Sequence, residues 1–214
     1  ALMFVYYLIT RWKELGKING KEYIVKTIVT TETIKTIAER NGVEMYDVYT
    51  GFKWIANVMR ENEGKKNYIG GGEESYGFLC EDFVRDKDAV SACVILAEIA
   101  AWAKDQGLSL YQLLQKIYVE YGFSKEKGIS VVKKGKSGAE EIEAMMKKFR
   151  ENPLTEIAGS KVTYFYDYST LKGKDYAENE TVTLDMPTTS NVLQYFTEDN
   201  TKVSIRPSGT EPKI

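Results

Sequence analysis

Short, mostly apolar runs alternate along the first part of the chain with segments whose apolar residues recur at helical spacing. Tyr23–Val29 is rich in β-branched and aromatic residues, which is typical of a buried strand. Val43–Tyr49 and Tyr68–Ile69 are two further short strand candidates. Strands that alternate with helices favour an α/β layer structure. We therefore expect a Rossmann-like α/β layer domain that extends to about Gly122.

The helical segments between these strands are recognised by their periodicity. Leu2, Val5, Tyr6 and Ile9 share one face and predict the first core helix. Thr31 or Thr33 is expected to cap the helix that carries Ile34, Ile37 and Ala38 on one face. The remaining predicted helices run through Trp54, Ile55 and Val58, over 88–104 and over Leu110–Tyr121.

The character of the sequence changes after Phe123. Residues 125–138 are rich in Lys and Gly and predict a hinge or a connecting hairpin, and an amphipathic helix is expected over 139–149. We therefore predict a smaller α+β domain with an antiparallel sheet, and a division into residues 1–127 and 128–214. The strands of this second domain are predicted at Val162–Tyr168, Val192–Thr197 and Val203–Ile205.

Composition excludes several classes of function. The chain has no histidine, which rules out Ser-His-Asp and Cys-His catalysis within it. Its net charge of -2 is not that of a nucleic-acid-binding protein. Cys80 and Cys93 fit neither a zinc site nor a CxxC redox pair, so we expect reduced, partly buried thiols in a cytoplasmic protein. The apolar opening run is too short to span a membrane. Both ends of the chain, Ala1 and Ile214, are expected to be cut ends.

A glycine-rich segment, Gly70–Gly77, directly follows a predicted strand. Its three consecutive glycines would let the backbone approach a ligand closely. The carboxylate of Glu73 could accept hydrogen bonds from two neighbouring hydroxyls of a sugar, and Ser75 could donate or accept. The alternative interpretation is a glycine-rich surface turn with solvated acids.

The second segment with recognisable chemistry, Arg206–Pro212, follows the last predicted strand. A planar guanidinium binds phosphate through two parallel hydrogen bonds. The hydroxyls of Ser208 and Thr210 can donate to phosphate oxygens, and Gly209 leaves backbone N–H groups free to form an anion nest. The alternative, an Arg-Pro turn with a hydroxyl-capped bend, explains fewer of these residues.

Together these segments resemble two loops of the α-D-phosphohexomutase family, which includes phosphoglucomutase and phosphomannomutase. Gly72–Ser75 is similar to the sugar-binding loop of the family's third domain, and Arg206–Thr210 to the phosphate loop of its fourth. Thr50–Trp54 is similar to the family's Thr-Gly loop, and Arg85–Asp88 to its Arg-x-Lys-Asp motif. The four motifs occur in the family's order. The resemblance identifies residues 1–127 as domain three and 128–214 as a C-terminally truncated domain four.

The resemblance implies a role for each matching residue. Glu73 and Ser75 would bind the sugar hydroxyls, while Arg206, Ser208, Gly209 and Thr210 would hold the phosphate that is not transferred. Lys87 would be the general acid/base, with a pKa lowered by nearby Arg85. The alternative for Lys87 is a solvated lysine at a helix N-terminus. The remaining substrate-binding candidates are Thr50, Gly51 and Lys53, together with Arg85.

Two motifs of the family are missing from the chain. A phosphoserine loop of the form Thr-Ala-Ser-His-Asn-Pro cannot occur without histidine, and no Asp-Gly-Asp-x-Asp-Arg metal loop is found. Asp82, Asp86 and Asp88 lack its spacing, so no metal ligand is predicted in this chain. The resemblance implies Mg²⁺ and glucose 1,6-bisphosphate as cofactors of the intact enzyme only. Its expected partners are hexose phosphates and the missing N-terminal domains, with no nucleic acid or membrane.

The sequence therefore predicts the C-terminal half of a phosphohexomutase, an isomerase that interconverts the 1-phosphate and 6-phosphate of a hexose through a phosphoserine on the missing half. This half alone is expected to be inactive. One alternative is a phosphoglucosamine or phosphopentose mutase of the same family. Another is a stand-alone sugar-phosphate-binding module.

Overall fold

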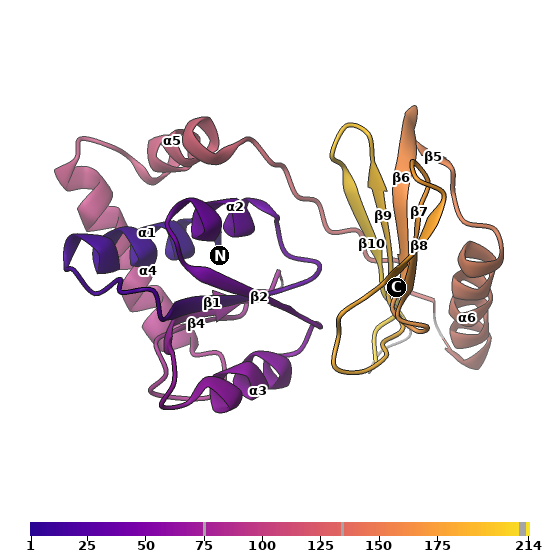
Figure 1. Ribbon diagram of the computed structural model, residues 1–214, viewed down its shortest axis with the longest axis horizontal. Coiled ribbons are helices and arrows are strands. Elements are labelled where there is room, and N and C mark those ends of the chain that lie inside the picture. Colours follow the sequence, from indigo (N-terminus) through magenta and orange to yellow (C-terminus); the bar gives the residue numbers. More distant parts are fainter. Residues whose placement is uncertain (75, 134, 210–212) are drawn as a thin grey trace. The chain divides into compact units, whose positions relative to one another are not determined.

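The computed structural model describes residues 1–74, 76–133, 135–209 and 213–214 of the chain (Figure 1). The chain divides into two compact units, residues 1–126 and 127–214. The first is an α/β unit with a mixed sheet and the second an α+β unit with an antiparallel sheet, so the predicted fold class is confirmed. Each unit has its own hydrophobic core.

The sheet of the first unit has the strand order β2-β1-β3-β4. Its central strand β1 (Glu22–Thr27) is parallel to β2 (Glu44–Val48) on one side and to β3 (Asn67–Gly72) on the other. The short strand β4 (Phe78–Cys80) adds an antiparallel edge beside β3. All six residues of β1 are buried, which is typical of a parallel strand with helices on both faces.

Helices cover both faces of this sheet (Figure 1). The helix α3 (Phe52–Asn62) packs on one face, where Ile55 and Met59 contact the aromatic residues of β1 and β3. On the other face a larger core surrounds Ile24 and Ile69. Four helices contribute to it: α1 (Leu2–Glu14), α2 (Thr33–Arg40), α4 (Ala89–Asp105) and α5 (Leu110–Tyr121).

Several details of the first unit differ from the sequence-based predictions. The residue at the N-cap of α2 is Glu32, without a side-chain capping bond, so neither Thr31 nor Thr33 is the cap. The Thr31 hydroxyl instead accepts from the backbone N–H of Thr33 at 3.3 Å. The edge strand β4 was not predicted, because three residues carry too little pattern to distinguish a strand from a loop. Cys93 is exposed rather than partly buried, whereas Cys80 is buried.

The second unit is an antiparallel sheet with the order β10-β9-β6-β7-β8, and β5 pairs with β6. The helix α6 (Gly135–Glu151) packs on it through Met146 and Phe149. Its strands are β5 (Glu156–Ile157), β6 (Ser160–Asp167), β7 (Lys172–Asp175), β8 (Glu180–Thr183), β9 (Leu193–Thr197) and β10 (Lys202–Ile205).

The sequence did not predict β5, β7 or β8. Lys172–Asp175 and Glu180–Thr183 are rich in polar residues and lie toward the edge of the sheet, where little side-chain burial is required. The predicted hinge or hairpin over 125–138 is wrong at its end, since α6 already begins at Gly135. Val131 instead exchanges backbone hydrogen bonds with Ile214, at 2.8 and 3.1 Å.

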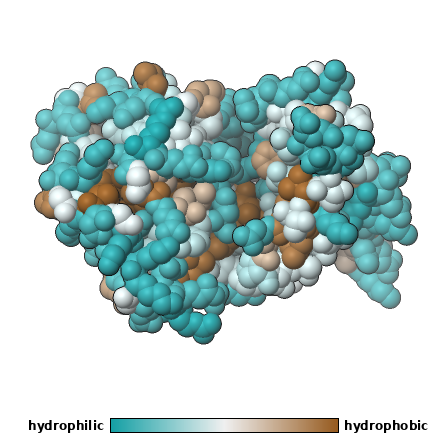
Figure 2. Space-filling view, viewed as in Figure 1, coloured by the Kyte–Doolittle hydropathy of each residue, from teal (hydrophilic) through white to brown (hydrophobic). Residues whose placement is uncertain are grey.

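The face of the molecule in Figure 2 is mostly hydrophilic, with hydrophobic residues exposed at several places between the hydrophilic ones. Isolated exposed apolar residues are normal for a folded domain. No helix in the described part of the chain combines the length and apolar character needed to cross a membrane.

Candidate functional site

The parallel strands β1, β2 and β3 end at one edge of the first sheet, and polar residues follow each of them. Ligands of open α/β sheets bind at this carboxyl edge. The loop after β2 contains Thr50 and Gly51, and the loop after β3 begins with Glu73. These two loops, together with the Arg85–Asp88 segment that follows β4, were singled out in the sequence and are candidates for one site.

The carboxylate of Glu73 joins two of these segments. Its Oε1 accepts a hydrogen bond from the backbone N–H of Gly51 at 2.6 Å. Gly51 is the N-cap residue of α3 and has φ +121°, a conformation that favours glycine. Glu73 is 7% exposed. A negative charge at this position is stabilised by the positive end of the α3 dipole.

Lys87 brings the third segment to the same carboxylate. Its Nζ lies 3.7 Å from Oε2 of Glu73, and about half of the lysine side chain is exposed. The same ammonium lies 5.8 Å from the ring centroid of Phe52 in the first turn of α3. A buried carboxylate thus lies between a backbone amide and an accessible ammonium group.

Glycines allow this close arrangement, but in a different way from the prediction. Gly70, Gly71 and Gly72 form the end of β3 and are buried, so they do not form an open ligand loop. A Cβ atom on Gly71 would lie 2.4 Å from the carbonyl oxygen of Val25 in the adjacent strand. A Cβ atom on Gly77 would lie 2.8 Å from Oε2 of Glu73. These glycines therefore let backbone and side chains of the protein itself come close.

The other predicted substrate-binding residues differ in their surroundings. The Thr50 hydroxyl oxygen is buried and, within the described residues, has no hydrogen-bond partner. The ammonium of exposed Lys53 lies 5.1 Å from the ring centroid of Trp54. Arg85 pairs with Glu63 at 2.8 Å, and the charged neighbour of Lys87 is Glu73. The expected effect of Arg85 on Lys87 stays a prediction. Ser75 lies outside the described residues.

The sequence analysis missed a buried lysine at the same edge. Lys26 in β1 is 1% exposed, and its Nζ lies 2.6 Å from Asp47 and 3.2 Å from Glu32. At the end of β1, the Thr27 hydroxyl donates to Glu74 at 2.8 Å. A charged residue within an otherwise buried strand was the available signal. Its two acidic partners come from other elements, and only the fold brings them together.

The predicted phosphate loop belongs to the second unit and follows β10 directly. Arg206 is exposed, and the space around the Cα of Gly209 is open. The backbone N–H of Ser208 donates to the carbonyl oxygen of Lys213 at 2.8 Å, so it is engaged within the loop. Thr210 lies outside the described residues.

The aspartates near Lys87 do not fit a magnesium ion. The two carboxylate oxygens of Asp88 accept from the backbone N–H groups of Val90 and Ser91, which caps α4. Asp86 accepts from the backbone N–H of Lys87 at 2.7 Å. Within the described ranges, no group of three or more acidic or cysteine side chains could hold a metal ion together.

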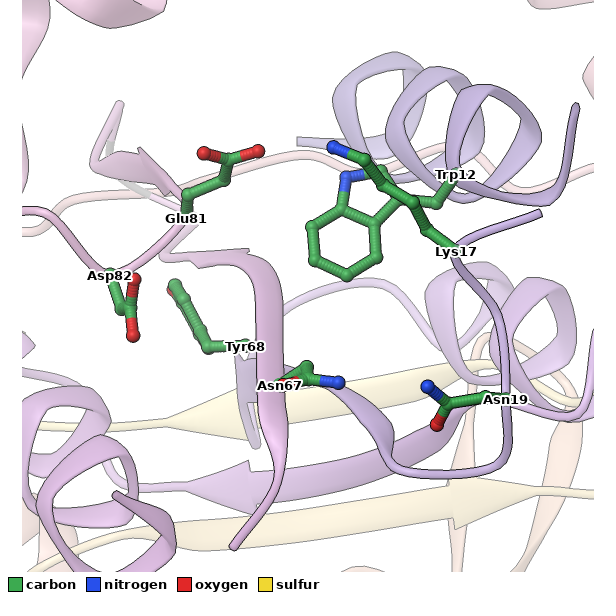
Figure 3. A pocket seen from close by; sticks show the side chains of 7 residues that line it. All are labelled: Trp12, Lys17, Asn19, Asn67, Tyr68, Glu81 and Asp82. Carbon is green, nitrogen blue, oxygen red and sulfur yellow. The ribbon is translucent and has the colours of Figure 1, made fainter. Parts of the chain in front are cut away.

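A shallow pocket of about 460 Å³ lies at the opposite, amino-terminal edge of the parallel strands (Figure 3). Trp12 and Lys17 line it from the segment before β1, and Glu81 and Asp82 from the segment after β4. The ammonium of Lys17 lies 5.2 Å from the Trp12 ring centroid. This pocket contains none of the predicted site residues.

The chain matches known proteins in sequence. Residues 3–121 match the family model described as phosphoglucomutase/phosphomannomutase, alpha/beta/alpha domain III. A phosphoglucomutase of Staphylococcus haemolyticus is 35% identical over 214 residues, which is 100% of this chain and 38% of that protein. A phosphoglucomutase of Staphylococcus aureus is 39% identical over 191 residues, 89% of this chain and 34% of that protein. The chain thus spans about a third of the length of these relatives.

A solved structure shares the fold at lower sequence identity. The open form of the exocytosis-sensitive phosphoprotein pp63/parafusin, a phosphoglucomutase from Paramecium, matches with a TM-score of 0.62 and 18% identity. The match covers 97% of this chain and 34% of that structure. The fold similarity therefore includes both units of the chain.

Proposed function

Because this chain belongs to the phosphoglucomutase/phosphomannomutase family, we propose that it is the sugar- and phosphate-binding part of a phosphohexomutase. The reaction is the reversible interconversion of the 1-phosphate and 6-phosphate of a hexose. In this reaction, a phosphoserine donates its phosphoryl group to the free hydroxyl of the hexose phosphate. The hydroxyl loses its proton, and a hexose 1,6-bisphosphate forms. The bisphosphate then changes its orientation in the site and transfers its other phosphoryl group to the serine.

The observation that carries this proposal is the convergence on Glu73. Three segments far apart in the sequence meet at its carboxylate: the Gly51 amide, the glycine-rich strand end and the Lys87 ammonium. Each carboxylate oxygen has two lone-pair sites, so Glu73 can still accept from sugar hydroxyls while it holds the Gly51 amide. Lys87 is accessible and is assigned to move the proton at the reacting oxygen.

The second unit supplies the anchor for the phosphate that is not transferred. Arg206 is exposed at the end of β10, and a guanidinium recognises a phosphate dianion irrespective of the carbon that bears it. We assign Ser208, Gly209 and Thr210 to the same loop. The phosphoserine, and the Mg²⁺ that accompanies it, are assigned to the part of the polypeptide that this chain does not span.

Calorimetry on the 214-residue chain with Arg206→Ala tests the shared anchor. Glucose 1-phosphate and glucose 6-phosphate should both bind at least about tenfold more weakly, since a hydrogen bond to a charged group contributes about 1.5–3 kcal/mol. Lys161→Ala removes an exposed charge elsewhere in the same unit and should change neither affinity. Weaker binding of only one of the two hexose phosphates would contradict the shared anchor. Failure of the unmodified chain to bind either phosphate would contradict the proposed function.

A further inference from the structure

The pocket at the amino-terminal edge of the first sheet lies at the opposite end of the parallel strands from the proposed sugar-phosphate site. Figure 3 shows two carboxylates, those of Glu81 and Asp82, on one side of it and Trp12 with Lys17 on the other. Its volume of about 460 Å³ falls within the range of about 300–1,000 Å³ that is typical of small-molecule sites. The pocket therefore has room for a ligand of its own.

A buried carboxylate holds part of the pocket lining in place. Glu22 is 1% exposed, and its Oε2 accepts from the backbone N–H groups of Asn19, Gly20 and Lys21. Its Oε1 accepts from the side-chain nitrogen of Asn67 at 3.2 Å. Asn19 and Asn67 both line the pocket. Because a buried charge is costly unless it is hydrogen-bonded, the contacts of Glu22 fix this part of the lining before any ligand binds.

The side of the pocket that carries the carboxylates is also held in place. Glu81 directly follows β4 and has φ +58°, which is uncommon for a residue other than glycine. Its backbone N–H donates to the carbonyl oxygen of Ile69 in β3 at 3.1 Å. Strained backbone of this kind is concentrated at ligand-binding sites. Glu81 is thus fixed to the sheet through its backbone, while the residue remains exposed to a ligand.

The charges of the lining disfavour ionic ligands of either sign. The carboxylates of Glu81 and Asp82 repel anions, so a phosphorylated sugar is a poor ligand here. The ammonium of Lys17 lies 5.2 Å from the Trp12 ring centroid, where a bound cation would otherwise lie. Because Lys17 is part of the same chain, its effective concentration at the ring is high and a free cation must displace it. A neutral ligand avoids both repulsions.

The hydrogen-bonding groups of the lining then select the kind of neutral ligand. A carboxylate such as that of Glu81 has only acceptors and can accept from two neighbouring hydroxyls. The side-chain nitrogen of Asn67 is engaged by Glu22, which leaves its oxygen as a further acceptor. The indole ring of Trp12 offers apolar surface for the C–H groups of a sugar ring. Several acceptors beside one aromatic ring match the hydroxyl groups and the apolar face of a sugar.

We propose that this pocket is a second carbohydrate site, which binds a neutral, unphosphorylated hexose unit. The unit is a free hexose or the end of an oligosaccharide, because both present the same hydroxyl groups. Since the pocket is shallow and open, we expect an affinity in the millimolar range. Such a site would hold the protein beside a neutral carbohydrate and leave the carboxyl edge of the sheet accessible. The inference does not depend on the proposed function.

Two tryptophans report separately on the two edges of the sheet. Trp12 lines the pocket, whereas Trp54 in α3 lies beside Gly51 at the proposed sugar-phosphate site. Maltose is titrated into the 214-residue chain carrying isotope-labelled tryptophan, and the indole N–H signals are followed by NMR. The Trp12 signal, assigned with Trp12→Phe, should shift in a saturable manner. Glucose is the second probe: an equal affinity assigns the pocket to a single hexose unit, and a response to maltose alone assigns it to the end of an oligosaccharide.

A substitution on the rim then tests whether the pocket itself makes the contact. Glu81→Gln should weaken maltose binding about threefold to tenfold, because it replaces a charged acceptor by an amide of the same shape. Glu151→Gln, at the exposed pair with Lys147 on α6, is the matched control and should leave the affinity unchanged. If the spectrum of Glu81→Gln shows that the fold is altered, Asp82→Asn at the next position makes the same test.

Four results would overturn the inference. The Trp12 signal could fail to shift in a saturable manner with both maltose and glucose. Glu151→Gln could weaken maltose binding as much as Glu81→Gln does. Choline could shift the Trp12 signal at a lower concentration than maltose, which would identify a cation as the ligand. Finally, glucose 1-phosphate could shift the Trp12 signal at a lower concentration than maltose, which would identify an anion. A shift of Trp54 with glucose 1-phosphate concerns the proposed function alone.

Discussion

At the scale of single residues, the proposed site depends on a carboxylate whose hydrogen-bonding capacity is partly used by the protein itself. Glu73 accepts from the Gly51 amide and lies beside Lys87, and at 7% exposure it is withdrawn from bulk water. A buried charge remains stable only when it is paired or hydrogen-bonded. These contacts also orient the carboxylate, so a ligand would meet an acceptor already held in position.

Glu73→Gln should therefore affect sugar selectivity more than phosphate binding. Glutamine keeps the shape but replaces one acceptor oxygen by a donor group that faces Lys87. The loss of hydrogen bonds to a charged group weakens binding of the preferred hexose 1-phosphate by about 1.5–3 kcal/mol. Calorimetry with glucose 1-phosphate, mannose 1-phosphate and inorganic phosphate measures this change in a chimera in which this chain replaces the matching segment of the Staphylococcus haemolyticus relative. Glu63→Gln, at the exposed pair with Arg85, is the control. If the affinity for inorganic phosphate fell as much as the affinity for the hexose 1-phosphate, Glu73 would not be the residue that binds the sugar hydroxyls.

The environment of Glu22 predicts that the free energy of unfolding depends on pH. Glu22 is 1% exposed and accepts from the backbone N–H groups of Asn19, Gly20 and Lys21. Burial would raise its pKa, but these hydrogen bonds outweigh burial and lower the pKa below the ordinary value of 4.5. The stabilisation is therefore complete above pH 4.5 and is lost as the pH falls through the lowered pKa.

Urea unfolding of the chain with and without Glu22→Gln measures that contribution. At pH 7 the substitution should lower the free energy of unfolding by about 1.5–3 kcal/mol, since it removes hydrogen bonds to a charged acceptor. At pH 3 the difference between the two proteins should shrink. A difference that is constant across this pH range would show that the ionised form of Glu22 is not what the fold stabilises.

At the scale of elements, the strand β3 packs closely against its neighbours and leads directly into the proposed site. Its glycines lie against β1 and β4, and the register pairs Gly71 with Val25. No side chain fits at Gly71. The strand therefore passes close to its neighbours. Glu73 directly follows Gly72, the last residue of β3, and so lies at the edge of the sheet.

Gly71→Ala should destabilise the first unit by about 1–3 kcal/mol, because the added methyl group meets backbone atoms that cannot move freely. Gly128→Ala is the matched control, because a Cβ atom there has no neighbour within 4 Å. This control should be neutral or stabilise the protein by up to about 1 kcal/mol. Thermal unfolding followed by circular dichroism compares the two variants. Equal stabilities would mean that β1 and β3 can separate without cost.

At the scale of the whole molecule, the chain consists of two units with separate cores. The proposed function assigns one kind of binding group to each unit. The first has the carboxylate and the lysine of the proposed sugar site, and the second has the arginine loop. Neither phosphoryl donor nor metal ligands are assigned to the described residues. Binding and chemistry are thus expected to separate experimentally.

The isolated 214-residue chain should have no mutase activity. A coupled assay with glucose 1-phosphate and glucose 1,6-bisphosphate measures the formation of glucose 6-phosphate. The Staphylococcus haemolyticus relative serves as the positive control under the same conditions. Turnover by the purified chain above the buffer blank would contradict the assignment of the phosphoryl donor to another part of the polypeptide.

The sequence by itself determined the fold class, the family and most of the helices. The helix predicted over Leu110–Tyr121 has the same bounds in the structure, because apolar residues at a period of 3.6 are a local signal. The polar strand β7 and the polar edge strand β8 carry no comparable signal, since their stability comes from pairing with neighbours.

Only the tertiary structure decided which charged groups meet. From the sequence, Arg85 was the expected neighbour of Lys87, because the two residues are close along the chain. The fold pairs Arg85 with Glu63 and places Lys87 beside Glu73, and it buries Lys26 against Asp47 and Glu32. Electrostatic interactions depend on distance in space. Residues from different elements become neighbours only once the strands and helices pack together, as Glu73 and Lys87 do beyond the carboxyl ends of the parallel strands.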